Sequence, residues 1–92
     1  MEKVKLFERD FADEANHIYH TEYYLLIHAS EFEKVYGVEI VRMDESGMER
    51  DAVEGFSESR EEAEAFLAKM AEGLALPVEL TALCDDHISG KN

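Results

Sequence analysis

The stretch HIYHTEYYLLIHA, residues 17–29, decides the fold class of this chain. Its odd positions carry aromatic, β-branched and aliphatic side chains, namely Tyr19, Thr21, Tyr23, Leu25 and Ile27. An alternation with a period of two is typical of a β-strand that buries one face. The unbroken apolar run over residues 23–27 predicts a central strand whose two faces are both covered at that end.

Three neighbouring segments are predicted to form further strands: residues 3–11, 35–43 and 48–56. In the first segment, Val4 and Leu6 share one face, and the alternation places Phe7 and Phe11 on the other. The links between the segments are short, and Asp44–Gly47 has the composition of a turn. Because parallel strands need crossovers of about a dozen residues or more, the pattern favours an antiparallel meander.

The chain becomes helical after Ser59. Ser59 and Glu62 have the spacing of a capping box, in which the hydroxyl accepts the amide proton of the third helical residue. Apolar residues then repeat at helical spacing: Ala63, Phe66, Leu67, Met70, Ala71 and Leu74. We expect Gly73 to end this helix in the left-handed conformation, residues 78–80 to be extended, and Thr81 to cap a short last helix.

Together these segments predict the α+β class: an antiparallel three- to four-stranded meander with one amphipathic helix packed on one face and a short C-terminal helix. The predicted core consists of Tyr23, Leu25, Ile27, Tyr36, Val38, Ile40, Phe66, Leu67 and Met70. One helix covers one face of the sheet, so the other face keeps an apolar group: Tyr24, Leu26, Val35, Val41 and Met43. Unless the N-terminal segment or the last helix covers it, this group is a possible self-association face, and a homodimer is the commonest use of such a face.

Length and charge limit what the chain can be and bind. With 92 residues, of which 46% are hydrophobic, we expect a single domain, residues 1–92, with an ordered core over about residues 3–88. The chain has 22 Asp and Glu against 9 Lys and Arg, a formal net charge of −13. This balance argues against direct binding of nucleic acid or of an anionic membrane. A single cysteine, with no signal-like or membrane-spanning apolar segment, favours a cytoplasmic location.

Three motifs along the chain resemble those of a known family. They are Tyr19-x-x-x-Tyr23-Tyr24-Leu25-Leu26, Tyr36-Gly37-Val38-Glu39-Ile40 and, after the helix, Pro77-x-x-Leu80-x-x-x-x-Asp85-Asp86. On these residues the chain is similar to a family of small bacterial proteins known as a domain of unknown function, over about residues 4–88. The resemblance implies a compact cytoplasmic α+β domain and brings no catalytic residues. The chain departs from the family at its end, where Cys84 and His87 enter an otherwise acidic and hydrophobic tail helix.

The sequence offers little for catalysis or for cofactor binding. It contains no Gly-x-Ser-x-Gly elbow, no Gly-x-Gly-x-x-Gly loop and no Walker loop. His17 and His20 fall on opposite faces of the predicted strand, and His28 lies too far along it to meet His20. We therefore expect no enzyme activity, no catalytic residues, no cofactor and no metal site.

The tightest group of ligand-type side chains is Cys84-Asp85-Asp86-His87. On a helix Cys84 and His87 share a face, so a metal-dependent sensor or enzyme is one alternative. A structural zinc site normally needs four ligands, and no second pair of ligands stands elsewhere in the sequence. The simpler interpretation is that Cys84 is a small buried hydrophobic residue and that the two aspartates are solvated.

Acidic side chains concentrate between residues 44 and 64, where nine acidic residues against two arginines leave a net charge of −7. On the predicted fold most of them form one acidic edge: Asp44, Glu45, Glu49, Asp51, Glu54, Glu58, Glu61 and Glu62. This edge predicts a non-enzymatic module that binds a basic surface of a protein partner. In a sharper form it imitates a nucleic-acid backbone, as inhibitors of the anti-CRISPR or anti-restriction type do. The alternatives are solubility with compensation of the helix dipole, and a housekeeping bacterial protein of unknown function.

Overall fold

In the computed structural model residues 1–89 are described, so the last three residues of the expected domain lie outside the description. The elements in chain order are β1 (Glu2–Ala12), β2 (Ile18–Ala29), β3 (Lys34–Asp44), β4 (Gly47–Ser57), α1 (Arg60–Glu72), the 3₁₀ helix η1 (Pro77–Glu79) and α2 (Leu80–Ser89). The predicted α+β class, with its strands, main helix and short last helix, is confirmed. No helix in the described part is long and apolar enough to cross a membrane.

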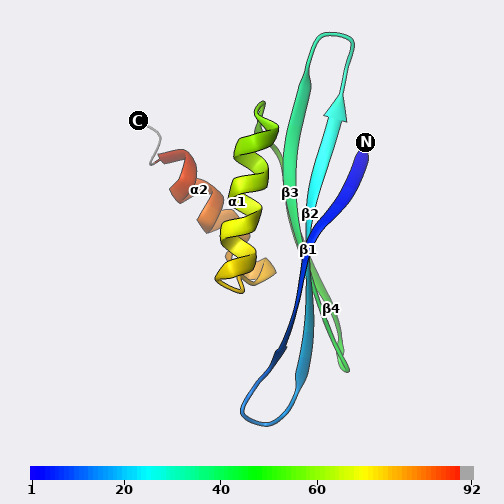
Figure 1. Cartoon of the computed structure of the whole chain (residues 1–92), viewed down its shortest axis with the longest axis vertical. Helices are drawn as coiled ribbons and strands as arrows, with labels where there is room; N and C mark the ends of the chain where they lie inside the picture. The colour runs from blue at the N-terminus through cyan, green and yellow to red at the C-terminus, as the bar shows by residue number, and fades with distance from the viewer. Residues whose placement is uncertain (90–92) are drawn as a thin grey trace.

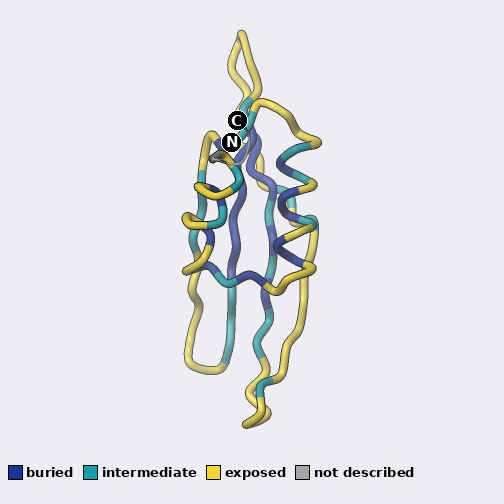
Figure 2. Tube along the Cα trace, turned by 90° about the vertical axis from the view of Figure 1, so that its left-hand side faces the viewer, coloured by how far each residue is buried: buried dark blue, intermediate teal, exposed yellow. Residues whose placement is uncertain are grey.

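The four strands pair in the order β1-β2-β3-β4, and each pair is antiparallel. The register joins Tyr23 to Ile40 and Leu25 to Val38, so the side chains predicted to share one face of β2 and β3 do share it. Both helices lie on this side of the sheet (Figures 1 and 2). Within residues 1–89 no helix lies on the opposite side, which we call the open face (Figure 1).

The core lies between the helix-covered face of the sheet and α1. All nine residues predicted to be buried there belong to one cluster of buried side chains, which Phe56, Leu80 and Cys84 join from β4 and α2. The Tyr23 hydroxyl donates a hydrogen bond to the carbonyl oxygen of Ala75 at 3.0 Å. Burial raises the pKa of Tyr23 to about 12. The segment between the helices therefore packs onto the sheet as well.

Helix α1 begins as predicted and ends differently. The Ser59 hydroxyl accepts a hydrogen bond from the Glu62 amide at 3.2 Å, which confirms the N-cap. Gly73 has a φ of −87°, so the prediction of a left-handed Gly73 is wrong. Leu74 takes that conformation instead, with a φ of 53°. The reason is a Schellman motif in which the amides of Leu74 and Ala75 donate to carbonyl groups of α1 at 3.3 and 2.9 Å.

Two predictions nearer the C-terminus are also wrong. The segment after Leu76 forms the 3₁₀ helix η1 rather than an extended chain. Pro77 suits the first helical position, and the Glu79 carboxylate accepts a hydrogen bond from the Leu76 amide at 2.9 Å. Thr81 does not cap α2, because this helix already begins at Leu80. The side chain of Leu80 is fully buried, so tertiary packing fixes the start of the helix.

Strand β1 contains a bulge that reverses its alternation. Val4 pairs with Leu25 whereas Phe7 pairs with Tyr23, so the register shifts by one residue before Phe7. The prediction that Phe7 and Phe11 lie opposite Val4 is therefore wrong, and all three face the helices. Beyond the bulge, the even-numbered side chains of β1 project from the open face.

Candidate binding surfaces

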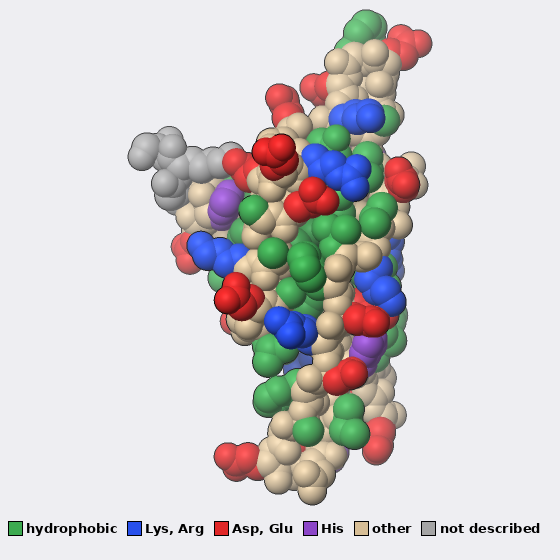
Figure 3. Space-filling view, viewed as in Figure 1, with side chains coloured by type: hydrophobic (Ala, Val, Ile, Leu, Met, Phe, Trp, Pro, Cys, Tyr) green, Lys and Arg blue, Asp and Glu red, His purple; other side chains and the backbone are tan. Residues whose placement is uncertain are grey.

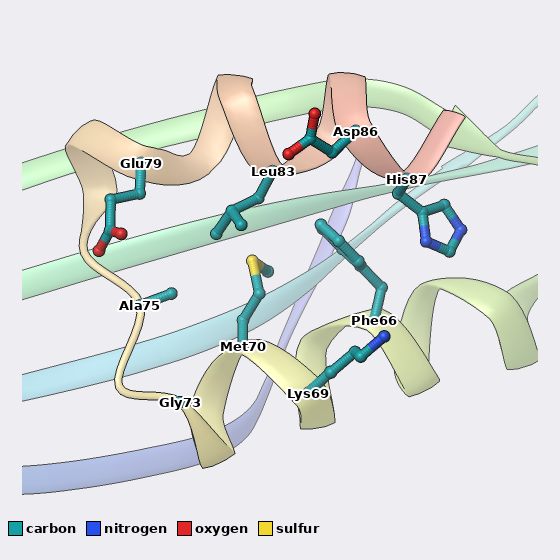
Figure 4. Close-up of a pocket in the computed structure, with 9 residues that line it drawn as sticks. All are labelled: Phe66, Lys69, Met70, Gly73, Ala75, Glu79, Leu83, Asp86 and His87. Carbon is teal, nitrogen blue, oxygen red and sulfur yellow. The ribbon is translucent and has the colours of Figure 1, made fainter. Parts of the chain in front are cut away.

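A groove of about 400 Å³ lies between α1 and α2. Its walls are apolar, and Figure 4 shows Phe66 and Met70 of α1 opposite Leu83 of α2. The charged side chains of Lys69 and Asp86 stand near its rim (Figure 4). Apolar walls with a charged rim suit contact with a small apolar group.

The ligand-type side chains near the C-terminus do not meet at one place. Cys84 is buried in the core, whereas Asp85 and Asp86 are exposed. The ring of His87 packs against Phe66, with their centres 5.1 Å apart. Burial raises the pKa of the Cys84 thiol to about 11, and the nearby charge of Asp85 adds to this effect. Cys84 is therefore protonated at neutral pH and is poorly suited to act as a nucleophile or a metal ligand.

The residues of the predicted acidic edge follow β4, which is an edge strand of the sheet. From one end to the other they are Asp44 and Glu45 at the β3–β4 turn, Glu49, Asp51 and Glu54 along β4, and Glu58, Glu61 and Glu62 at the start of α1. Asp51 pairs with Ile40 and faces the helices, whereas Glu54 lies 3.5 Å from His28 Nε2 on the open face. They form an elongated band around one edge of the sheet, which we call the acidic band.

Part of the acidic band is engaged by neighbouring groups. Glu49 accepts a hydrogen bond from Arg42 Nη2 at 3.1 Å. Asp44 accepts hydrogen bonds from the Ser46 hydroxyl and from backbone amides of the turn, and these lower its pKa. The side chains of three exposed members, unlike those of the exposed Glu49 and Glu54, take part in no hydrogen bond or ion pair within residues 1–89: Glu45, Glu58 and Glu61. The band therefore presents its freest negative charge at its two ends.

The open face buries side chains although neither α1 nor α2 covers it. Leu26 is 2% exposed and Val41 is 6% exposed. The Glu39 carboxylate, also 2% exposed, lies 2.6 Å from Lys3 Nζ and 3.0 Å from Arg50 Nη2. Lys3 and Arg50 reach inward from the edge strands β1 and β4, so their long side chains cover the middle of the face.

A second charged group on the open face centres on His20 of β2. Its Nδ1 lies 2.6 Å from Asp10 Oδ1, and its Nε2 lies 3.2 Å from Glu22 Oε2 and 3.4 Å from Glu8 Oε2. Lys5 Nζ lies 3.0 Å from the same Glu8 oxygen and 3.4 Å from the Glu22 oxygen. The hydrogen bond to Asp10 is the main cause of a raised His20 pKa. Figure 3 shows histidine, acidic and basic side chains close together on the side away from the helices.

The sequence alone does not reveal this group, because its members come from two strands. Antiparallel pairing places Glu8 opposite Glu22 and Asp10 opposite His20. Without the bulge in β1, Glu8 and Asp10 would face the helices. The sequence signal consists of two short patterns, Glu-x-Asp at residues 8–10 and His-x-Glu at residues 20–22. These patterns indicate a charged group only when the register between β1 and β2 is known.

The residues of the predicted self-association face do share the open face: Tyr24, Leu26, Val35, Val41 and Met43. Neither β1, which is a strand of the sheet itself, nor α2, which lies on the helix side, covers this face (Figure 1). Tyr24, Val35 and Met43 are partly exposed, whereas the other two are buried. Lys3 Nζ also lies 4.4 Å from the centre of the Tyr24 ring. The face therefore offers a partner less apolar area than the sequence pattern indicates.

One family matches the chain over almost its whole length. It is described as a family of unknown function (DUF6514), and the match covers residues 2–90. No curated protein and no solved structure matches the chain. The expectation that the chain belongs to a family of unknown function is confirmed, and the protein is a member of the DUF6514 family.

Proposed function

We propose that the chain is a non-enzymatic module that binds a basic surface of a protein partner through the acidic band. The observation that carries this proposal is the net charge of −7 held by residues 44–64 around one edge of the sheet. Such a charge attracts a basic surface and raises the rate of encounter, and salt screens it beyond about 8 Å at physiological ionic strength.

The charges on the open face support the acidic band, rather than the open face, as the surface that binds a basic partner. On the open face, Glu39 stands between Lys3 and Arg50, and Lys5 lies beside Glu8. Negative side chains there have cationic neighbours, so the face attracts a basic protein less strongly. Much of the net charge of −13 lies away from this face.

In its sharper form, the proposal is that the acidic band imitates a nucleic-acid backbone and inhibits its partner by occupying a nucleic-acid-binding surface. Strand β4 has 11 residues, so at about 3.4 Å per residue it is roughly 37 Å long. Glu49, Asp51 and Glu54 lie along this length, and the other five carboxylates of the band stand near its two ends, at the β3–β4 turn and at the start of α1. A row of negative charge that follows an elongated edge supports mimicry and predicts that duplex DNA competes with the chain.

The chemistry of two candidate nucleophiles supports the non-enzymatic part of the proposal. Cys84 is buried, and its raised pKa keeps the thiol protonated. The hydroxyl of Ser59 accepts a hydrogen bond as the N-cap of α1. Within residues 1–89, no hydrogen bond joins either side chain to a general base that would activate it.

Affinity capture from a cell lysate, with two matched triple variants, tests the proposal. The band variant carries Glu45→Gln, Glu58→Gln and Glu61→Gln. The control carries Glu14→Gln, Glu31→Gln and Glu33→Gln, which change exposed glutamates in the two other loops of the sheet. Both variants change the net charge equally. We expect the wild type and the control to capture the same protein at low salt and the band variant to lose it. Equal capture by both variants would contradict the proposal.

Duplex DNA added to the captured complex tests the sharper form. If the acidic band occupies a nucleic-acid-binding surface, DNA displaces the chain from its partner, and the displacement weakens as salt rises. If DNA leaves the complex intact while the band variant still fails to bind, the partner is basic and the mimicry is wrong.

A further inference from the structure

We propose that His20, Glu22 and Glu8 form a binding site for a divalent transition-metal ion on the open face. One ligand atom from each of the three side chains lies within 4.8 Å of the other two. The His20 Nε2 distances to Glu22 and Glu8 oxygens are 3.2 and 3.4 Å. Two ligand atoms bound at about 2.0–2.1 Å to a tetrahedral zinc ion are roughly 3.3 Å apart. The two distances from His20 match this value.

Two further side chains orient the ligands. In the neutral imidazole, Nδ1 of His20 donates its proton to Asp10 at 2.6 Å, which leaves the lone pair of Nε2 directed at the two glutamates. When one ring nitrogen of a histidine binds a metal, the other usually donates a hydrogen bond to a carboxylate, a carbonyl group or water, which fixes the orientation of the ring. The Tyr24 hydroxyl donates to Glu22 Oε1 at 2.5 Å. This hydrogen bond leaves Glu22 Oε2 facing His20.

A positive charge already lies between the two glutamates. Lys5 Nζ is 3.0 Å from Glu8 Oε2 and 3.4 Å from Glu22 Oε2, the same oxygens that face His20. The ammonium group therefore marks the place where the surrounding side chains stabilise a cation. Because its stem is flexible and 43% exposed, Lys5 can move into solvent when an ion with a higher charge arrives.

The set of donors selects the kind of ion. One imidazole nitrogen with two carboxylate oxygens suits zinc and its transition-metal neighbours, whereas calcium and magnesium prefer oxygen donors only. Three protein ligands leave a further coordination position for water or for a group from a partner. The site stands on two paired strands, β1 and β2, which hold the ligands in register. The site uses no residue of the acidic band and needs no protein partner.

Titration of the chelator-treated full chain with Zn²⁺, followed by isothermal calorimetry, tests the site. We expect one equivalent to bind, and His20→Asn or Glu22→Gln to weaken binding by about tenfold or more. Lys5→Met should bind the ion more tightly, because it removes the competing ammonium group. The matched control is His28→Asn, an exposed histidine of the same strand, which should leave the affinity unchanged.

Several results would overturn the proposal. They are no binding by the wild type, equal binding by His20→Asn, or a loss of binding in His28→Asn. If a ligand variant does not fold, nitrogen NMR of the wild-type histidines decides the matter. Addition of Zn²⁺ should shift Nε2 of His20 and leave His28 unmoved, and the absence of a shift at His20 would reject the site.

Discussion

The two faces of the sheet bury neighbouring residues in different ways. Leu25 and Leu26 are adjacent in β2 and are 0% and 2% exposed. Leu25 faces the helices and belongs to the apolar core. Leu26 faces the other way, where its cross-strand neighbour is Lys3, and where Arg50 reaches in from the opposite edge. Low exposure therefore arises on one face from packed helices and on the other from long charged side chains.

This difference should have energetic and functional consequences. A core closed by helices keeps its shape when a side chain is truncated, so a cavity remains and costs free energy. A cover of flexible lysine and arginine stems can move into the gap or admit water. The open face is therefore expected to tolerate change, and its charged side chains stay available to ions and partners.

Truncating a core side chain on the helix-covered face should lower the free energy of unfolding more than a change on the open face or a rise in pH. Phe66 stacks on Phe56 with ring centres 4.7 Å apart and is buried between α1 and β4. We expect Phe66→Ala to lower the free energy of unfolding by about 3–5 kcal/mol, which is enough to unfold a domain of this size. Thermal and urea melts measure the change. A small change would mean that α1 is not packed as described.

Alkaline pH should destabilise the folded chain, because Tyr23 is buried in the helix-covered face and resists losing its proton. The unfolded chain loses the Tyr23 proton near the ordinary value of 10.0, whereas the folded chain holds it to about 12. The free energy of unfolding should therefore fall as pH rises through this window. Two pKa units correspond to about 2–3 kcal/mol at most. Urea melts of Tyr23→Phe should show a shallower fall, and an unchanged slope would remove Tyr23 as the cause.

Neutralising Glu39, the buried carboxylate of the open face, should lower the free energy of unfolding by less than Phe66→Ala does. Lys3 and Arg50 are 39% and 59% exposed, so both can return to water when Glu39 no longer attracts them. We expect Glu39→Gln to lower the free energy of unfolding by about 1 kcal/mol, with a smaller difference at high salt. A loss of about 3 kcal/mol or more would show that the open face behaves as a closed core.

Self-association through the open face stays a prediction and should be the weakest effect. Leu26 and Val41 are already buried there, so Tyr24 and Met43 offer much of the remaining apolar contact. Sedimentation over a concentration series at moderate salt, which relieves the repulsion between two chains of net charge −13, should show a dimer at high concentration. Tyr24→Glu should dissociate it. A monomer at every concentration would reject this assembly.

The helix-covered face could be predicted because its signals are local. Alternation around Tyr23 and Val38 and the helical spacing of Phe66 and Met70 each identify a buried face from neighbouring residues alone. The capping pattern at Ser59 is local as well. The left-handed position after α1 was not predictable to the residue, because the choice of Leu74 over Gly73 depends on hydrogen bonds of the last turn.

The charged groups of the open face could not be predicted in the same way. Their geometry depends on which residues face each other across strands, and a single bulge before Phe7 decides whether Glu8 faces His20 or the helices. The burial of Glu39 likewise depends on Lys3 and Arg50, which are distant in sequence. The acidic band was visible in the sequence as a run of charge, but its shape around β4 needed the order of the strands.

The contrast between the two faces is tested most directly by Leu25→Ala and Leu26→Ala, which remove the same atoms from adjacent buried positions. We expect Leu25→Ala to cost about 3–5 kcal/mol, as in a rigid core, and Leu26→Ala to cost about 1–3 kcal/mol, because the charged cover can close the gap. Urea melts of the two variants under one set of conditions give both values. Equal costs would contradict the account, since they would show that the open face is packed as tightly as the face under the helices.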